Sequence, residues 1–274
     1  MVKNKIELYE IKDQNVNAAV NKIVVEIFNK RKTENHKGQV ILLTGASPLA
    51  GTTSTAINLA IAAASTGSQV LLVDGDVRKA EKYKRLNEKT DMGLADYLLQ
   101  DMYKCGNDSL QPSQILYETN IENLQYVPCG SYNTTPQRVL CSRRMAQFTE
   151  AMQAQFDYVI CDLPSISLVP DAEVLFPLSD GIILVTALDE TRKQSLKIAK
   201  NKIRPYVDRY YGMIINKIPQ DVYRKAAKGF DYYLSDVKGG QKLGRNTPYR
   251  EYEKKRRAEE RAASKKREAE ERKK

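Results

Sequence analysis

Three aspartates follow apolar runs of the sequence. Carboxylates at such positions can take part in phosphoryl transfer. Asp74 and Asp76 follow the run 70–73, and Asp162 follows the run 158–161. Parallel α/β sheets bind ligands at the carboxyl ends of their strands, so we expect the three side chains to converge on one site. Carboxylates gathered there can hold Mg²⁺ and provide a general base. One aspartate after a strand can simply cap the next helix, but three at matching positions favour a site.

A second segment with chemical meaning is TGASPLAGTTST, residues 44–55, which lies between a β-type apolar run and an alanine-rich helical run. Strand, loop and helix in this order are the context of a phosphate-binding loop. The pattern GxxxxGK[ST] fails twice, because Ala46 stands at its first glycine and Thr52 follows Gly51 where lysine is usual. The helix start still favours an anion without the lysine.

The elements that position these residues are read from hydrophobic patterning. Continuous apolar runs separated by helical segments predict an α/β fold with a doubly wound, mostly parallel sheet and helices on both faces. The predicted strands are 40–43, 70–73, 158–161, 182–186 and 213–215. Before them, Val16, Val20, Ile23 and Ile27 recur at helical spacing and predict an amphipathic helix packed on the sheet.

Length and charge divide the chain into one large domain, 1–228, and a charged tail, 229–274, expected to be flexible or a single solvated helix. Residues 221–274 hold 18 Lys and Arg against 10 Asp and Glu, so most of the net charge of +10 lies there. The four cysteines form no CxxC pair, the sequence shows no signal peptide, and no run approaches a membrane span. A cytoplasmic protein is expected.

Several segments together resemble the bacterial tyrosine kinases of capsule and exopolysaccharide operons, which are related to the MinD and ParA ATPases with a P-loop fold. The resemblance extends over residues 15–220 and is carried by TGASPLAGTTST, LLVDGDVR, GLADYLL, ENLQYVPCGSYNTTPQRVLCSRRM, DYVICDLPSISLVPDA, SDGIILVTALDETR and GMIINKI. The fourth of these segments is particular to the kinases and favours them over MinD or ParA.

The resemblance implies a binding site for ATP or ADP with Mg²⁺. Asp74 would accept the tyrosine proton, with Asp76 beside it as a second catalytic carboxylate. Asp76 and Asp162 would organise the metal together with Thr53. The backbone of Gly51, Thr52 and Thr53 would bind phosphate, and Asn216 occupies the position where relatives contact adenine.

Departures from the family pattern are equally specific. Thr52 replaces the catalytic lysine, and no lysine occurs between positions 37 and 79. Leu49 stands where the family has glycine, which would be strained if that position keeps a positive φ. The charged oligomerisation motif is replaced by Asn17, Val20 and Ile23, so a monomer or small homo-oligomer is expected. The tyrosines of the tail are scattered: Tyr223, Tyr232, Tyr233, Tyr249 and Tyr252.

These observations leave three hypotheses. The first is a diverged, weakly active or inactive regulator of polysaccharide biosynthesis, with nucleotide binding weak or lost. It would be recruited to the inner face of the membrane by an adaptor of the polysaccharide co-polymerase type. The second is an active ATP-dependent tyrosine autokinase. The third is a MinD- or ParA-like positioning protein whose basic tail binds nucleic acid or lipid. Outside that tail, the sequence has no strong signal for nucleic-acid binding.

Overall fold

The structure, a computed structural model, describes residues 6–9, 11, 13–30, 37–78, 92–103, 110–131, 135–219 and 222. The chain divides into two units, Met1–Ile218 and Pro219–Lys274, and the fold given below is that of the first. The predicted tail and its boundary at residue 229 lie outside the described residues. They therefore remain predictions.

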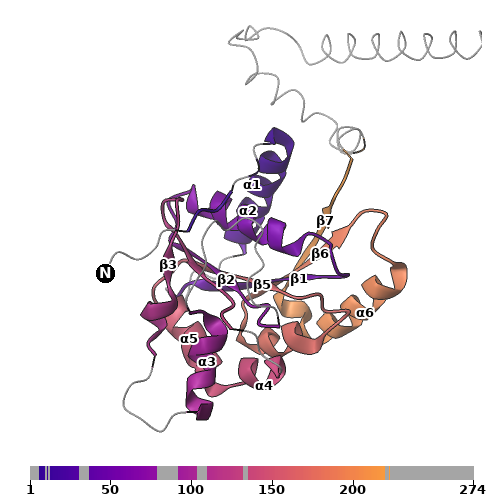
Figure 1. Cartoon of the computed structure of the whole chain (residues 1–274). Helices are drawn as coiled ribbons and strands as arrows, with labels where there is room; N and C mark the ends of the chain where they lie inside the picture. The colour runs from indigo at the N-terminus through magenta and orange to yellow at the C-terminus, as the bar shows by residue number, and fades with distance from the viewer. Residues whose placement is uncertain are drawn as a thin grey trace, which may run out of the picture. The chain divides into compact units, whose positions relative to one another are not determined.

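A seven-stranded sheet forms the centre of the first unit (Figure 1). Its strands are β1 (Gln39–Gly45), β2 (Val70–Asp74), β3 (Tyr117–Glu118), β4 (Leu124–Val127), β5 (Tyr158–Leu163), β6 (Gly181–Ala187) and β7 (Tyr210–Asn216). The order is β3-β4-β2-β5-β1-β6-β7, and every neighbouring pair is parallel except β3 with β4. Because β1, β2, β5 and β6 are buried at every position, their sequences are continuous apolar runs.

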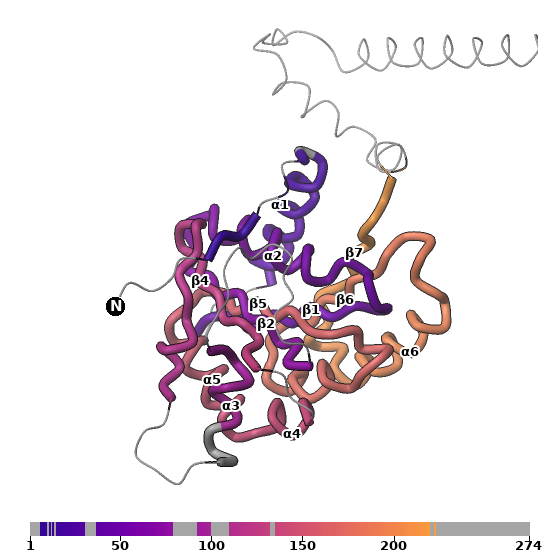
Figure 2. The backbone as a smooth tube through the Cα atoms, viewed as in Figure 1, coloured from indigo at the N-terminus to yellow at the C-terminus, as the bar shows by residue number. Residues whose placement is uncertain are grey.

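Helices cover both faces of this sheet, which confirms the predicted doubly wound α/β fold (Figures 1 and 2). One face carries α1 (Gln14–Asn29) and α2 (Thr52–Ala64). The other carries α3 (Leu94–Tyr103), α4 (Pro136–Leu140), α5 (Arg143–Gln153) and α6 (Lys193–Ile203), with the 3₁₀ segments η3 (Pro170–Leu178) and η4 (Arg204–Arg209). A third 3₁₀ segment, η2 (Pro112–Ile115), precedes β3. The predicted amphipathic helix is α1, which the Asp13 side chain caps.

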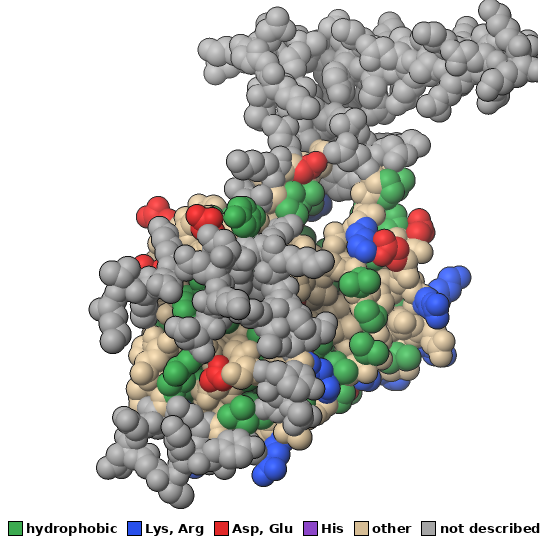
Figure 3. Space-filling model, viewed as in Figure 1, with side chains coloured by type: hydrophobic (Ala, Val, Ile, Leu, Met, Phe, Trp, Pro, Cys, Tyr) green, Lys and Arg blue, Asp and Glu red, His purple; other side chains and the backbone are tan. Residues whose placement is uncertain are grey.

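The surface seen in Figure 3 carries apolar, basic and acidic side chains side by side. Within the described residues, no helix is both long enough and apolar enough to cross a lipid bilayer.

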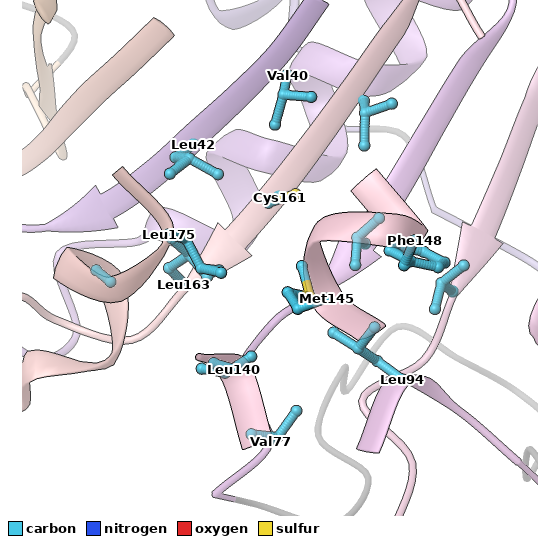
Figure 4. Packing of buried hydrophobic residues seen from close by; sticks show 14 of the residues in the cluster. Val40, Leu42, Val77, Leu94, Leu140, Met145, Phe148, Cys161, Leu163 and Leu175 are labelled. Carbon is cyan, nitrogen blue, oxygen red and sulfur yellow. The ribbon is translucent and has the colours of Figure 1, made fainter. Parts of the chain in front are cut away.

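The core forms two layers because successive side chains of a strand point to opposite faces of the sheet. Leu42 of β1 belongs to the layer under α5, whereas Leu43 belongs to the layer under α2. Figure 4 shows the first layer, in which Leu42 and Cys161 of the sheet lie near Met145 and Phe148 of α5. The site at the strand ends is therefore supported from both sides by packed side chains.

An N-terminal segment, which the sequence pattern did not predict, lies beside β3. The N–H of Ile6 donates to the Glu118 carbonyl at 2.9 Å, and Ile6 forms a parallel bridge with Thr119. The Asn120 side chain accepts from the N–H of Leu8 at 2.7 Å and donates to its carbonyl at 3.1 Å. Ile6 and Leu8 are both buried, so this short segment is part of the core.

Candidate functional site

The three predicted aspartates gather at the carboxyl edge of the sheet. Asp74 ends β2 and lies directly opposite Asp162 on β5 in the strand register. Both side chains are buried. Asp76 follows two residues later, and its backbone N–H donates to Oδ1 of Asp74 at 3.0 Å. The turn after β2 therefore orients the Asp74 carboxyl group.

The start of α2 is joined directly to this group of acids. Oγ1 of Thr53 donates a hydrogen bond to Oδ2 of Asp162 at 2.6 Å. The structure thus brings together Thr53 and Asp162, two of the three side chains expected to organise Mg²⁺. The third, Asp76, lies on the adjacent turn through its contact with Asp74.

Electrostatics at the strand ends disfavour a fully ionised site. Burial, the larger effect, and the neighbouring Asp162 carboxylate together raise the pKa of Asp74 to about 8, and the hydrogen bond from the Asp76 N–H opposes this shift. A hydrogen bond from the Cys129 thiol is a smaller opposing effect. Two buried carboxylates this close favour sharing a proton or binding a cation.

The donor set fits Mg²⁺ better than a metal held by protein alone. Within the described ranges, no group of three or more His, Cys, Asp or Glu side chains could hold a metal ion. Mg²⁺ commonly takes only one or two carboxylates and completes its octahedron with water and substrate phosphates. Thr53 and Asp162, with Asp74 and Asp76 beside them, supply such a partial set next to the predicted phosphate-binding loop.

The loop that precedes α2 has two residues with positive φ, and its side chains depart from the phosphate-binding pattern. Gly51 starts the helix with φ of 86°, and Leu49 has φ of 60°. A branched side chain in this left-handed region costs about 1–2 kcal/mol. The Leu49 side chain is 86% exposed, so burial of apolar surface does not offset this strain.

Thr52 occupies the position of the missing lysine. Its Oγ1 would lie 2.8 Å from a Cβ added at Gly45, which places the hydroxyl over the backbone at the end of β1. A threonine side chain is short and uncharged at neutral pH. The loop therefore keeps backbone N–H donors at the start of α2. At position 52 it lacks a cation that could stabilise the negative charge on a phosphoryl group during transfer.

Neighbouring segments hold the loop in place. Ser165 Oγ donates to the Gly45 carbonyl at 3.0 Å, and the hydroxyl groups of Ser47 and Thr191 are 2.9 Å apart. Nδ2 of Asn216, at the end of β7, donates to the Ala50 carbonyl at 3.0 Å. The predicted adenine-contact residue thus lies against the loop backbone, and the loop is held by residues after β5, after β6 and at the end of β7.

An ion pair that sequence reasoning missed tethers the second aspartate motif. Arg78 forms a bidentate contact with Asp171 of η3, with Nη2 to Oδ1 at 2.8 Å and Nε to Oδ2 as the second contact. Asp171 is only 1% exposed. The sequence signal for Asp171 was weak, because an aspartate after proline at a helix start is usually interpreted as a cap.

A second missed feature is the junction of α3 with the segment after β4. Oδ2 of Asp96 accepts from the N–H of Gly93 at 2.8 Å and from the N–H of Ser131 at 3.2 Å. Gly130 has φ of 80°, and a Cβ there would lie 2.4 Å from the same Asp96 oxygen. Only glycine fits this contact, which fixes the segment that carries Cys129 beside Asp74.

Comparisons with known proteins agree with this architecture. The AAA domain family model matches residues 39–211. The tyrosine-protein kinase CpsD of Streptococcus pneumoniae serotype 4 is 33% identical over 183 residues, which are 66% of this chain and 77% of that protein.

Two solved structures show the same fold. The chimerical protein CapA2B2 matches with a TM-score of 0.65 at 23% identity, over 80% of this chain and 96% of that chain. Cobyrinic acid a,c-diamide synthase of Mycobacterium smegmatis, solved with bound ADP and magnesium, matches with a TM-score of 0.51 at 17% identity, over 73% of this chain and 81% of that chain.

Proposed function

Because the chain belongs to the CpsD-type family of bacterial tyrosine-protein kinases, we propose that it is a weakly active or inactive regulator of capsule or exopolysaccharide biosynthesis. It binds ATP or ADP with Mg²⁺ weakly and transfers phosphate poorly. The observation that carries this proposal is Thr52, whose uncharged hydroxyl lies over Gly45 and which replaces the lysine of the family pattern. Loss of one preorganised charge contact to a transition state costs about 3 kcal/mol, or a hundredfold in rate.

The rest of the machinery supports retained binding. Thr53 and Asp162 are hydrogen-bonded, and Asp74 lies beside them as the general base. Backbone N–H groups of Gly51, Thr52 and Thr53 at the start of α2 bind phosphate. When bound, Mg²⁺ would be held by Thr53, Asp76 and Asp162, and it would neutralise phosphate charge.

The partner is a membrane adaptor of the polysaccharide co-polymerase type, which brings the chain to the inner face of the membrane. The assembly is a monomer or small homo-oligomer. In α1, Val20 is buried and Ile23 packs against the core, so neither presents a charged contact to a neighbouring copy. This arrangement supports the absence of the family's charged ring contacts.

A second candidate function is an active tyrosine autokinase. The close grouping of Asp74, Asp76 and Asp162 favours it, since these carboxylates would serve metal binding and proton transfer in an active enzyme. The two functions differ in a measurable way. The regulator binds nucleotide without robust tyrosine phosphorylation, whereas the autokinase accumulates phosphotyrosine that depends on Asp74.

The test combines calorimetric binding of ATP and ADP, with and without Mg²⁺, with an anti-phosphotyrosine assay on the purified full chain. We expect weak, Mg²⁺-dependent binding and a phosphotyrosine signal near background. Robust autophosphorylation that is abolished in Asp74→Asn would contradict the regulator hypothesis and support the autokinase hypothesis. Binding of neither nucleotide at millimolar concentration would remove nucleotide from the proposal and leave a scaffold.

A further inference from the structure

The outer face of α6 carries a line of basic side chains that the nucleotide site does not use. Lys193, Lys197, Lys200 and Arg204 recur at intervals of four, three and four residues, which places them on one side of the helix. All four are exposed. Figure 3 shows Lys and Arg side chains along the margin of the molecule where Figure 1 places α6.

The opposite side of α6 is fixed to the core. Ala199 and Ile203 are buried there. Lys202 is turned inward, where Nζ donates to the Ile166 carbonyl at 2.9 Å and pairs with Glu173 at 2.7 Å. The helix therefore cannot rotate to bring the line of basic residues inward.

The four outer residues contribute little to the fold. Among the residues that the structure describes, no acidic side chain forms an ion pair with any of them. Like charges three or four residues apart on a helix repel one another. A helix that keeps four such charges on one face is better explained by an external anionic partner than by stability.

Positive charge is concentrated in the segment that carries this face rather than spread over the first unit. Residues 192–209 contain seven Lys and Arg and one acidic residue, Asp208. The remainder of residues 1–220 contains 19 Lys and Arg against 23 Asp and Glu. Outside α6 and η4, the unit is therefore slightly acidic, which would orient it with α6 toward an anionic partner.

An aliphatic side chain accompanies the basic ones. Val207 of η4 is 64% exposed. Val207 also lines a hollow of about 280 Å³ between α6 and η4, together with Lys200, Asn201, Ile203, Arg204 and Tyr210. Cationic groups around exposed aliphatic groups match a membrane interface, with phosphate headgroups above the acyl chains.

We propose that the α6–η4 face, defined by Lys193, Lys197, Lys200, Arg204 and Val207, binds the anionic surface of a phospholipid bilayer. The line of charges extends for about 16 Å along the helix, so it can contact several headgroups at once. Nucleic acid fits less well, because base stacking uses exposed aromatic rings. The aromatic residues described at this face, Tyr206 and Tyr210, are partly buried.

The experiment uses the full chain and sedimentation with vesicles of phosphatidylcholine alone or mixed with phosphatidylglycerol. We expect binding only to the mixed vesicles, and we expect it to weaken as salt is raised. The triple variant Lys197→Gln, Lys200→Gln, Arg204→Gln should reduce affinity by about tenfold or more. A separate Val207→Ser variant should reduce it with no change of charge.

A matched control triple, Lys22→Gln, Arg138→Gln and Arg143→Gln, removes the same charge from exposed positions outside this face. It should reduce vesicle affinity by less than about twofold. Equal losses in the two triples, or no binding to mixed vesicles by the parent, would overturn the proposal. A third result would also overturn it: the variant with Lys197, Lys200 and Arg204 replaced loses binding to labelled duplex DNA but still binds the mixed vesicles. Circular dichroism melts establish that each variant is folded.

Discussion

Asp74 and Asp162 lie directly opposite each other at the carboxyl ends of β2 and β5, both buried, with Thr53 donating to the second of them. The arrangement holds two acidic groups where only one ionises readily. The site is therefore prepared for a proton or a cation, and its properties should depend on pH.

The first prediction concerns that pH dependence. Burial and, to a smaller extent, Asp162 raise the pKa of Asp74 from 3.8 to about 8. Between these two pH values the folded protein holds a proton on Asp74, whereas the unfolded chain does not. Stability should therefore fall as pH rises toward 8, with a slope of at most about 1.4 kcal/mol per pH unit. Asp74→Asn should flatten this slope, which urea unfolding at a series of pH values measures.

An exposed aspartate provides the matched control for this titration. Asp208→Asn changes the same charge at an exposed site on η4 and should leave the slope unaltered. Parallel curves for the parent and Asp74→Asn would show that Asp74 does not carry the proton.

The second prediction concerns Thr53. Thr53→Val removes the hydroxyl that donates to Asp162, whereas Thr53→Ser retains it. We expect ADP with Mg²⁺ to raise the melting temperature of the parent by about 1–3 °C at concentrations a few times the Kd. Thr53→Ser should keep this shift and Thr53→Val should lose it. Equal shifts in both variants would exclude the hydroxyl from metal and nucleotide binding.

The third prediction tests the loop itself. Leu49 has φ of 60° and Thr52 carries no positive charge, so two defects affect one phosphate position. Thr52→Lys alone should recover little activity. The double variant Leu49→Gly, Thr52→Lys should recover more than the sum of the two single variants, because neighbouring sites are not additive. Single-turnover ATP hydrolysis and phosphotyrosine signal provide the readout, and purely additive effects would contradict a shared site.

The fourth prediction concerns Arg78 and Asp171. Arg78→Ala leaves the buried Asp171 carboxylate without its bidentate partner and should lower the free energy of unfolding by about 2–4 kcal/mol. Arg78→Ala with Asp171→Asn should recover part of that loss, since no buried charge then remains. Chemical denaturation measures both. A double variant as unstable as the single one would assign the effect to packing of the arginine side chain.

The strands β1, β2 and β5, which lead into the loop and the aspartates, were predictable because each is buried on both faces. Such strands produce continuous apolar runs, and the polar residue at the end of each run marks the ligand-binding edge. The grouping of Asp74, Asp76 and Asp162 followed from this rule alone. The strand β4 was not predicted, because the partly exposed Gln125 interrupts its apolar residues and leaves no continuous apolar run.

Contacts between segments far apart in sequence could not be predicted. The tether from Arg78 to Asp171 spans 93 positions, and Asn216 reaches the loop at Ala50 across 166 positions. No local pattern encodes such a pairing, because each partner alone is compatible with an ordinary capping or surface position. The resemblance to a family indicated a role for Asn216 but not its hydrogen bond to the Ala50 carbonyl.

The segment at Ile6 and Leu8 also decides how two copies of this sheet could join. An open sheet with two bare edges can add copies at both ends and grow into a fibre. Here the β3 edge is occupied by the chain's own N-terminal residues, and among the described residues only β7 ends the sheet without a neighbouring strand. Pairing through β7 would use the one edge of the described sheet that has no neighbouring strand, so a pair joined there leaves no such edge in the described part of either copy. Removing the segment that holds Ile6 and Leu8 would open the β3 edge as a second place for pairing.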